Sequence, residues 1–242
     1  MDVLLEVHLT MVLEIRNLSF SYEDGLEALR DVSLRVGDGE KVAIVGANGA
    51  GKSTLLLHLN GVLEGTGQVF VGGRRVQPAN LMEIRRSVGL VFQDPDDQLF
   101  SSTVFEDVAF GPLYMGLPEE KVRERVEAAL RAVGMQRMAG RAPHRMSLGE
   151  KKLAAVATVL SMDPRILALD EPTSGLDARA TRRITRLLAG LDLAVLVATH
   201  DLSLVREILP RTIVMDRGEI VADGSTERIL ADRPLLVRHG LV

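Results

Sequence analysis

One segment of the sequence constrains the fold more than any other: the stretch from Gly46 to Ser53, which reads G-A-N-G-A-G-K-S. It follows the short apolar run Lys41–Val45, which is typical of a strand buried on both faces, and it precedes Lys52–Asn60, which has a helical composition. The stretch fits the G-x-x-x-x-G-K-[ST] pattern, in which a glycine-rich turn and a helix N-terminus present backbone N–H groups to an anion. We therefore predict a phosphate-binding loop in an α/β fold.

Each residue type in this loop has its own expected task. The ammonium of Lys52 is expected to contact the β- and γ-phosphates of a nucleotide, and the hydroxyl of Ser53 to coordinate Mg²⁺. A glycine-rich turn that binds nothing is the alternative, and the flanking strand and helix argue against it. We assign the remaining contacts with the nucleotide to Gly46, Asn48, Gly49, Ala50, Gly51 and Thr54.

A second segment, Ile166–Glu171, reads as an apolar strand that ends in two carboxylates. We expect Asp170 to lie beside the magnesium ion and Glu171 to accept a proton from an attacking water. An apolar strand that meets an acidic loop is common, so this segment alone does not predict a catalytic site. It does so only because the same chain also contains the phosphate-binding loop.

Composition excludes several classes of protein. With 33 acidic and 29 basic residues the net charge is −4, which argues against a nucleic-acid-binding protein. The absence of cysteine excludes disulfides and thiolate metal sites, and no apolar run reaches the roughly 18 residues that span a bilayer. The N-terminus lacks the pattern of a secretion signal, and we expect Met1–Thr10 to be an extension that precedes a natural start at Met11.

The order of patterns along the chain predicts one domain over residues 11–242. Residues 11–98 are expected to form a nucleotide-binding core with a β-rich subdomain, and residues 161–242 to continue that core. Between them, residues 99–160 predict a helical subdomain. One of its helices extends from Pro118 to Gly134 with a single apolar face, and a second begins near Ser147. Two short runs near the C-terminus, Ile213–Met215 and Glu219–Val221, predict a hairpin.

Four further motifs make the chain similar to the ATPases of ATP-binding-cassette (ABC) transporters from Met11 onward. Tyr22 stands where that family stacks an aromatic ring on adenine, and Gln93 matches the glutamine of its Q-loop. Ser174–Asp177 matches the D-loop, and His200 matches the switch histidine that contacts the γ-phosphate.

The resemblance implies a P-loop NTPase fold of the ABC ATPase type. It has a mixed central sheet, an N-terminal antiparallel β subdomain and an inserted helical subdomain. ATP and Mg²⁺ are the expected ligands. Glu171, His200 and Gln93 are the expected catalytic residues, and Ser53, Gln93 and Asp170 are the expected contacts of the metal ion.

The family's signature segment, usually Leu-Ser-Gly-Gly-Gln, reads Met-Ser-Leu-Gly-Glu here. The resemblance implies that Ser147 and Gly149 contact the γ-phosphate held by a second protomer. The β-carbon of Leu148 restricts the backbone where glycine is usual, and Glu150 adds a negative charge near an anion. We expect these two departures to affect the rate of hydrolysis more than the binding of ATP.

Two stretches, Phe92–Phe100 and Val104–Pro112, are similar to the energy-coupling-factor type of ABC ATPase, especially those of cobalt and nickel uptake. This similarity implies a homodimer, or a heterodimer with a similar ATPase, bound to transmembrane subunits at the cytoplasmic face of the cell membrane. The alternatives are the ATPase of a vitamin importer or of another ABC importer, and a slow or non-hydrolysing regulatory ABC protein. No nucleic-acid partner is expected.

Overall fold

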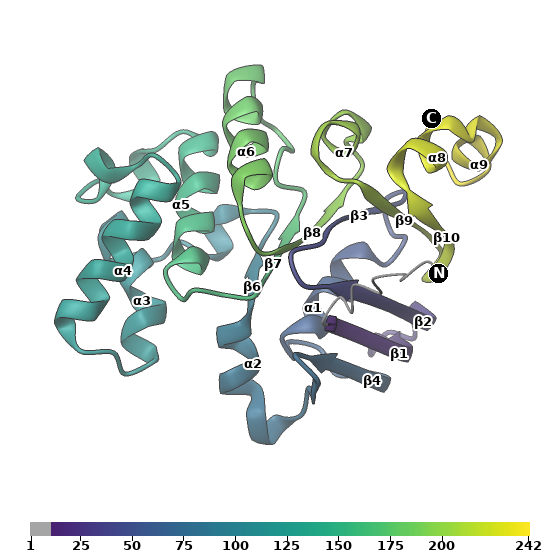
Figure 1. Cartoon of the computed structure of the whole chain (residues 1–242), viewed down its shortest axis with the longest axis horizontal. Helices are drawn as coiled ribbons and strands as arrows, with labels where there is room; N and C mark the ends of the chain where they lie inside the picture. The colour runs from purple at the N-terminus through teal and green to yellow at the C-terminus, as the bar shows by residue number, and fades with distance from the viewer. Residues whose placement is uncertain (1–10) are drawn as a thin grey trace, which may run out of the picture.

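The structure, a computed structural model, describes residues 11–242, so the extension expected at residues 1–10 lies outside the described part. Within that part the strands form two sheets, which lie against each other (Figure 1). The strands are β1 (Met11–Ser21), β2 (Glu27–Gly37), β3 (Lys41–Val45), β4 (Thr66–Val71), β5 (Arg74–Arg75), β6 (Val88–Val91), β7 (Ile166–Asp170), β8 (Ala194–Thr199), β9 (Arg211–Asp216) and β10 (Glu219–Ser225).

Helices cover the larger sheet, and three of them form a separate group beside it. The α-helices of the described residues are α1 (Lys52–Leu59), α2 (Leu81–Ser87), α3 (Val104–Tyr114), α4 (Glu119–Ala132), α5 (Leu148–Leu160), α6 (Ala178–Gly190), α7 (Leu202–Ile208), α8 (Thr226–Ala231) and α9 (Arg233–Arg238). Helices α3, α4 and α5 pack on one another to one side of the sheets, and we call them the helical subdomain (Figure 1).

The larger sheet has the order β10-β9-β3-β8-β7-β6 and is parallel except for the antiparallel β9–β10 pair, which confirms the predicted C-terminal hairpin. The smaller sheet has the order β2-β1-β4-β5 and is antiparallel throughout. This arrangement confirms the expected mixed central sheet with an N-terminal antiparallel β subdomain. Within residues 11–242 no helix has both the length and the apolar character needed to cross a bilayer.

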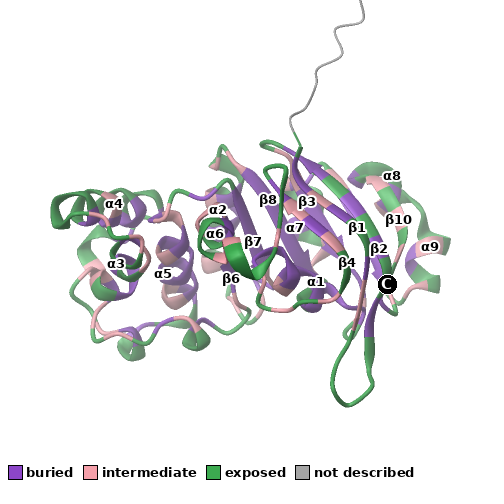
Figure 2. Ribbon diagram, turned by 90° about the horizontal axis from the view of Figure 1, so that it is seen from below, coloured by how far each residue is buried: buried purple, intermediate pink, exposed green. Residues whose placement is uncertain are grey.

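Strands β3, β7 and β8 are apolar except for one residue at an end of each, and they are buried because both of their faces are covered (Figure 2). In β3, alternate side chains enter two different cores. Val42 and Ile44 pack with the smaller sheet and α1, whereas Ala43 and Val45 pack with the residues of the helical subdomain and of α6 and α7. β3 therefore fixes the loop that follows it against both layers of the molecule.

The topology brings the predicted motifs together. Val45, at the end of β3, pairs with Thr199 of β8, and Asp170, at the end of β7, pairs with Ala198 of β8. Because these strands are parallel, their carboxyl ends meet at one edge of the sheet, where ligands bind in open α/β folds. The segments that follow the three strands contain the phosphate-binding loop, Glu171 and His200.

Candidate functional site

The phosphate-binding loop needs glycine at two places for steric reasons. A β-carbon on Gly46 would lie 2.4 Å from the carbonyl oxygen of Met215. Gly51, the N-cap of α1, has a φ of 99°, and a β-carbon there would lie 2.5 Å from the carbonyl oxygen of Ala28. The loop therefore packs against β2 and β9, and the N-terminus of α1 is open toward a cleft.

An open cleft of about 460 Å³ lies over this loop. Its wall combines residues of the β1–β2 turn, the loop, α1, the segment after β6, and the carboxyl ends of β7 and β8. The predicted site residues on this wall are Tyr22, Asn48, Gly49, Ala50, Gly51, Lys52, Ser53, Thr54, Gln93, Asp170, Glu171 and His200.

Three predicted residues do not line the cleft. Gly46 lies beneath the loop, against the backbone of β9. Ser147 and Gly149 lie at the N-terminal end of α5, in the helical subdomain. The side chain that caps α5, Ser147, is exposed to solvent.

Lys52 is buried inside the loop. Its Nζ donates hydrogen bonds to the carbonyl oxygens of Gly46 at 2.8 Å and Ala47 at 3.1 Å. An ammonium carries three donors, so one donor remains for a phosphate oxygen. Burial lowers the pKa of Lys52, and the carboxylates of Glu171 and Asp170 act in the opposite direction.

The side chains of Asp170 and Ser53 suit a magnesium ion. Oδ1 of Asp170 is buried and has no hydrogen-bond partner among the described residues. Burial raises the pKa of Asp170, and the Ser53 hydroxyl beside it lowers the pKa. A carboxylate with an unused oxygen next to a hydroxyl is a set of hard oxygen donors, the kind that Mg²⁺ prefers.

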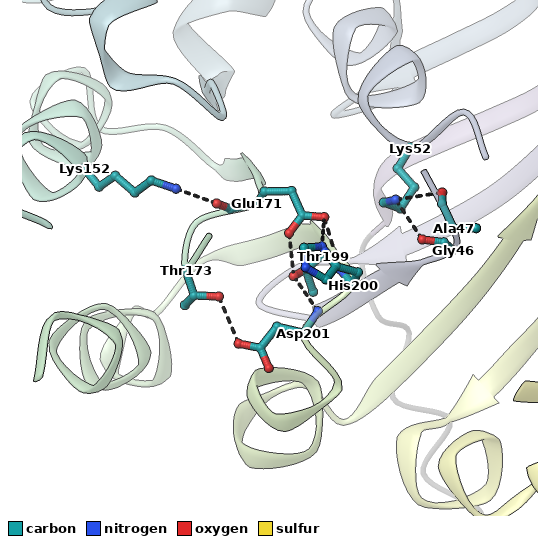
Figure 3. A network of polar contacts seen from close by, with 9 residues as sticks. All are labelled: Gly46, Ala47, Lys52, Lys152, Glu171, Thr173, Thr199, His200 and Asp201. Carbon is teal, nitrogen blue, oxygen red and sulfur yellow. Dashed lines mark hydrogen bonds and ion pairs between the residues drawn. The ribbon is translucent and has the colours of Figure 1, made fainter. Parts of the chain in front are cut away.

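Two residues hold the carboxylate of Glu171: Thr199, the last residue of β8, and His200, which follows it (Figure 3). Oε1 accepts a hydrogen bond from the backbone N–H of His200 at 3.1 Å and lies 2.8 Å from Nδ1 of the same residue. Oε2 accepts a hydrogen bond from Oγ1 of Thr199 at 3.0 Å. Sequence analysis missed Thr199, although the residue stands directly before the switch histidine.

An aromatic side chain, that of Tyr22, forms part of the cleft wall. The Tyr22 hydroxyl lies 3.0 Å from Oγ1 of Thr54, on the second residue after the loop lysine. The Tyr22 ring meets Phe20 edge to face, with 4.9 Å between ring centroids. Tyr22 is 37% exposed, so a ring face remains for a planar base.

The departures from the usual signature segment have a local explanation. Ser147 caps α5 in a capping box: Oε2 of Glu150 accepts hydrogen bonds from the backbone N–H of Ser147 at 2.8 Å and from its Oγ at 3.1 Å. The carboxylate of Glu150 is therefore held by hydrogen bonds from Ser147. Leu148 is the first residue of α5 and has no positive φ, so its β-carbon causes no backbone strain.

Comparison with known proteins identifies the family. The family model described as ABC transporter matches residues 29–174, more than half of the chain. The chain belongs to the ATPase family of ABC transporters. The activity of this family is the hydrolysis of ATP coupled to transport, which agrees with the geometry of the cleft.

Individual relatives extend the match over nearly the whole chain. A Gloeobacter violaceus protein named as an ABC transporter ATP-binding protein is 53% identical, over 95% of each chain. The energy-coupling factor transporter ATP-binding protein EcfA of Methanothermobacter thermautotrophicus is 48% identical, over 95% of this chain and 76% of its own length. The name of the second protein agrees with the predicted energy-coupling-factor type.

Two solved structures share the fold. CbiO1 of Clostridium perfringens, described as part of the ABC transporter complex CbiONQ, has a TM-score of 0.84 and 36% identity, over 96% of this chain and 95% of its own. The ATP-binding cassette MJ0796, a dimer in a post-hydrolysis state bound to ADP and Pi, has a TM-score of 0.80 and 28% identity, over 88% of this chain and 98% of its own.

Proposed function

We propose that this chain is the ATP-hydrolysing subunit of a membrane importer whose cargo is cobalt or nickel ions. The observation that carries the ATPase part is the convergence of the phosphate-binding loop, the Asp170–Glu171 pair and His200 on one cleft. The cargo is supported by the similarity to CbiO1 of a CbiONQ complex, together with the sequence from Phe92 to Pro112.

In this proposal each residue of the cleft has a separate role in phosphoryl transfer. The loop amides and Lys52 bind the triphosphate, and Tyr22 stacks on the base. Ser53, Gln93 and Asp170 would hold a magnesium ion, which supplies neutralisation of phosphate charge when bound. Glu171 accepts the proton of the attacking water, and His200 and Gln93 orient that water and the γ-phosphate.

Two copies of the chain are needed for a complete site. Ser147, which is exposed, and Gly149, which is buried against α6, lie at the N-terminus of α5 and not on the cleft of their own copy. A helix N-terminus and a hydroxyl suit the γ-phosphate of a second copy, so we propose head-to-tail closure around two ATP molecules. The dimer of the similar cassette MJ0796 supports this arrangement.

The surface of the helical subdomain supports a membrane partner. Phe100, Phe110 and Tyr114 are each more than half exposed, and their rings form one cluster with centroid separations of 5.1 and 6.4 Å. The acidic turn Asp94–Asp97 precedes this cluster in the sequence. An exposed apolar patch suits the apolar face of an amphipathic helix, and we propose that it receives a segment of a transmembrane subunit at the cytoplasmic face of the membrane.

A transport measurement tests the cargo. The chain is purified with the membrane subunits that accompany it, reconstituted in vesicles and assayed for ATP-dependent uptake of radiolabelled cobalt and nickel. We expect uptake of one of these ions that Lys52→Ala abolishes. ATP-dependent uptake of a vitamin without uptake of either ion would contradict the cargo and leave the ATPase assignment standing.

A further inference from the structure

A buried lysine of the helical subdomain contacts the proposed catalytic base. Lys152 lies on α5, five residues after Ser147, and is only 4% exposed. Its Nζ donates a hydrogen bond of 2.6 Å to the backbone carbonyl oxygen of Glu171 (Figure 3). The mechanism above assigns no task to this lysine.

The backbone of Glu171 needs such support. Its φ is 44°, in the left-handed region that residues with a side chain rarely adopt. The N–H of Glu171 donates to the carbonyl oxygen of Ala198 at 2.8 Å, and the carbonyl oxygen of Glu171 also accepts from the N–H of Ser174 at 3.2 Å. Lys152 is thus the one side chain, among residues 11–242, that holds this carbonyl group from outside its own loop.

The charge and shape of lysine both suit this position. Asp170, Glu171 and Asp94 supply negative charge around the ammonium, which compensates for part of its burial. The chain contains 24 arginines and only 5 lysines, yet a lysine stands here. A single carbonyl accepts from a compact ammonium, whereas the five donors of a guanidinium would leave several buried N–H groups without acceptors.

The preceding residue, Lys151, connects α5 to the turn that follows Gln93. Nζ of Lys151 lies 2.6 and 2.8 Å from the two carboxylate oxygens of Asp96, in the turn that follows Gln93. Consecutive lysines therefore join the helix capped by Ser147 to the segments that contain Gln93 and Glu171.

We propose that Lys152 is a positioning residue for hydrolysis: it links the end of α5 that meets the partner copy's nucleotide to the Glu171 of its own copy. Seating of Ser147 on the partner's ATP then fixes the backbone of Glu171, so each site becomes competent when the other is occupied. This inference rests on the proposed role of Glu171 as the base.

The test compares Lys152→Met and Lys152→Gln in the full-length protein. Lys121→Met is the control, since Lys121 is an exposed lysine of α4 that pairs with Glu124 on the same helix. Steady-state hydrolysis and ATP binding are measured for each. We expect Lys152→Met to lower kcat by about 10- to 100-fold with little change in the KM for ATP, because a small misplacement of the base slows the chemical step. Lys152→Gln should recover part of the loss, because its amide still donates to the carbonyl, and Lys121→Met should keep the parent kcat.

A second measurement separates positioning from folding. Each Lys152 variant is combined with Glu171→Gln, and ATP-driven dimer formation is measured by sedimentation. We expect the dimer to form as in Glu171→Gln alone. A parent kcat in Lys152→Met, equal losses in Met and Gln variants, or loss of the dimer in the combined variant would each overturn the proposal. Full turnover by Glu171→Gln alone would instead contradict the role of the base.

Discussion

At the scale of single residues, the proposed hydrolysis of ATP depends on the orientation of Glu171. Its carboxylate accepts hydrogen bonds from the Thr199 hydroxyl and the His200 backbone, and its backbone is held in the left-handed region. Such preorganised contacts fix a base without a cost at the moment of reaction. The side chain therefore lies on the cleft wall in a defined position beside Asp170.

Glu171→Gln keeps the shape and most hydrogen bonds of this side chain but cannot accept the proton of an attacking water. We expect hydrolysis to fall by about 10²- to 10⁴-fold, while MgATP binding is retained. Phosphate release and calorimetric titration measure the two properties on the same preparation. Near-parental phosphate release by this variant would show that another group is the base.

His58 makes the stability of the fold depend on pH, and this effect is separate from catalysis. Its side chain is buried, Nδ1 lies 2.7 Å from the carbonyl oxygen of Thr54, and burial lowers its pKa. The unfolded chain therefore binds a proton on this residue more readily than the folded chain does. Stability from the neutral ring is fully present above the unfolded pKa of about 6.5, and it is lost as the pH falls below that value toward the lowered pKa of the folded state.

We predict that His58→Gln reduces this pH dependence, because an amide can replace the hydrogen bond to Thr54 and does not titrate. The free energy of unfolding is measured by urea denaturation at about pH 7.5 and about pH 5.5. The parent should lose more stability than the variant over this interval. An equal loss of stability in both proteins would show that groups other than His58 cause the acid sensitivity.

At the scale of elements, β6 and α5 pack too closely to admit a side chain at Gly89. A β-carbon on Gly89 would lie 1.8 Å from Cγ1 of Val159. We expect Gly89→Ala to lower the free energy of unfolding by about 1–3 kcal/mol, because a packed core cannot admit another methyl group without strain.

The double variant Gly89→Ala with Val159→Ala checks the cause. Removal of the valine methyl groups makes room for the new methyl, so the double variant should lose less stability than the sum of the two single changes. Chemical denaturation of the four proteins measures this coupling. Additive losses would show that the two side chains do not compete for the same space.

Ser147 caps the N-terminus of α5 and is also proposed to contact the ATP of a second copy. Measurements of stability and of dimer formation separate these two roles. Ser147 caps α5 and Thr103 caps α3 with the same capping-box geometry. We expect Ser147→Ala and Thr103→Ala each to cost about 1 kcal/mol of stability. Only Ser147→Ala should weaken ATP-driven dimer formation, as followed by sedimentation in the Glu171→Gln background. Equal effects of both variants on the dimer would contradict the contact of Ser147 with ATP.

Elements with a strong local pattern were predictable from the sequence. β3, β7 and β8 are apolar except for one residue at an end of each, and the helix with the periodic apolar face, α4, ends shortly before Gly134. β4 and α2 carry little such signal. β4 contains Gly67 and is buried only in part, and α2 is two turns long with Ile84 as its only buried residue. Tertiary contacts, more than local propensity, decide such short elements.

At the scale of the whole molecule, sequence motifs identified the residues of the cleft, but not how they contact one another. The phosphate-binding loop has a pattern that one sequence can reveal, because its function depends on consecutive residues. The contact between Lys152 and Glu171 joins residues that are 19 positions apart in different subdomains, and no local pattern reports it. The same holds for Thr199, whose contact with Glu171 depends on the pairing of β7 with β8.

The central claim is that two copies of this chain close around ATP held by the phosphate-binding loop of one and the Ser147 end of α5 of the other. Sedimentation velocity of the Glu171→Gln protein with MgATP, with MgADP and without nucleotide tests it most directly. The account predicts a dimer with MgATP and monomers in the other two conditions. A protein that stays monomeric at saturating MgATP would contradict it.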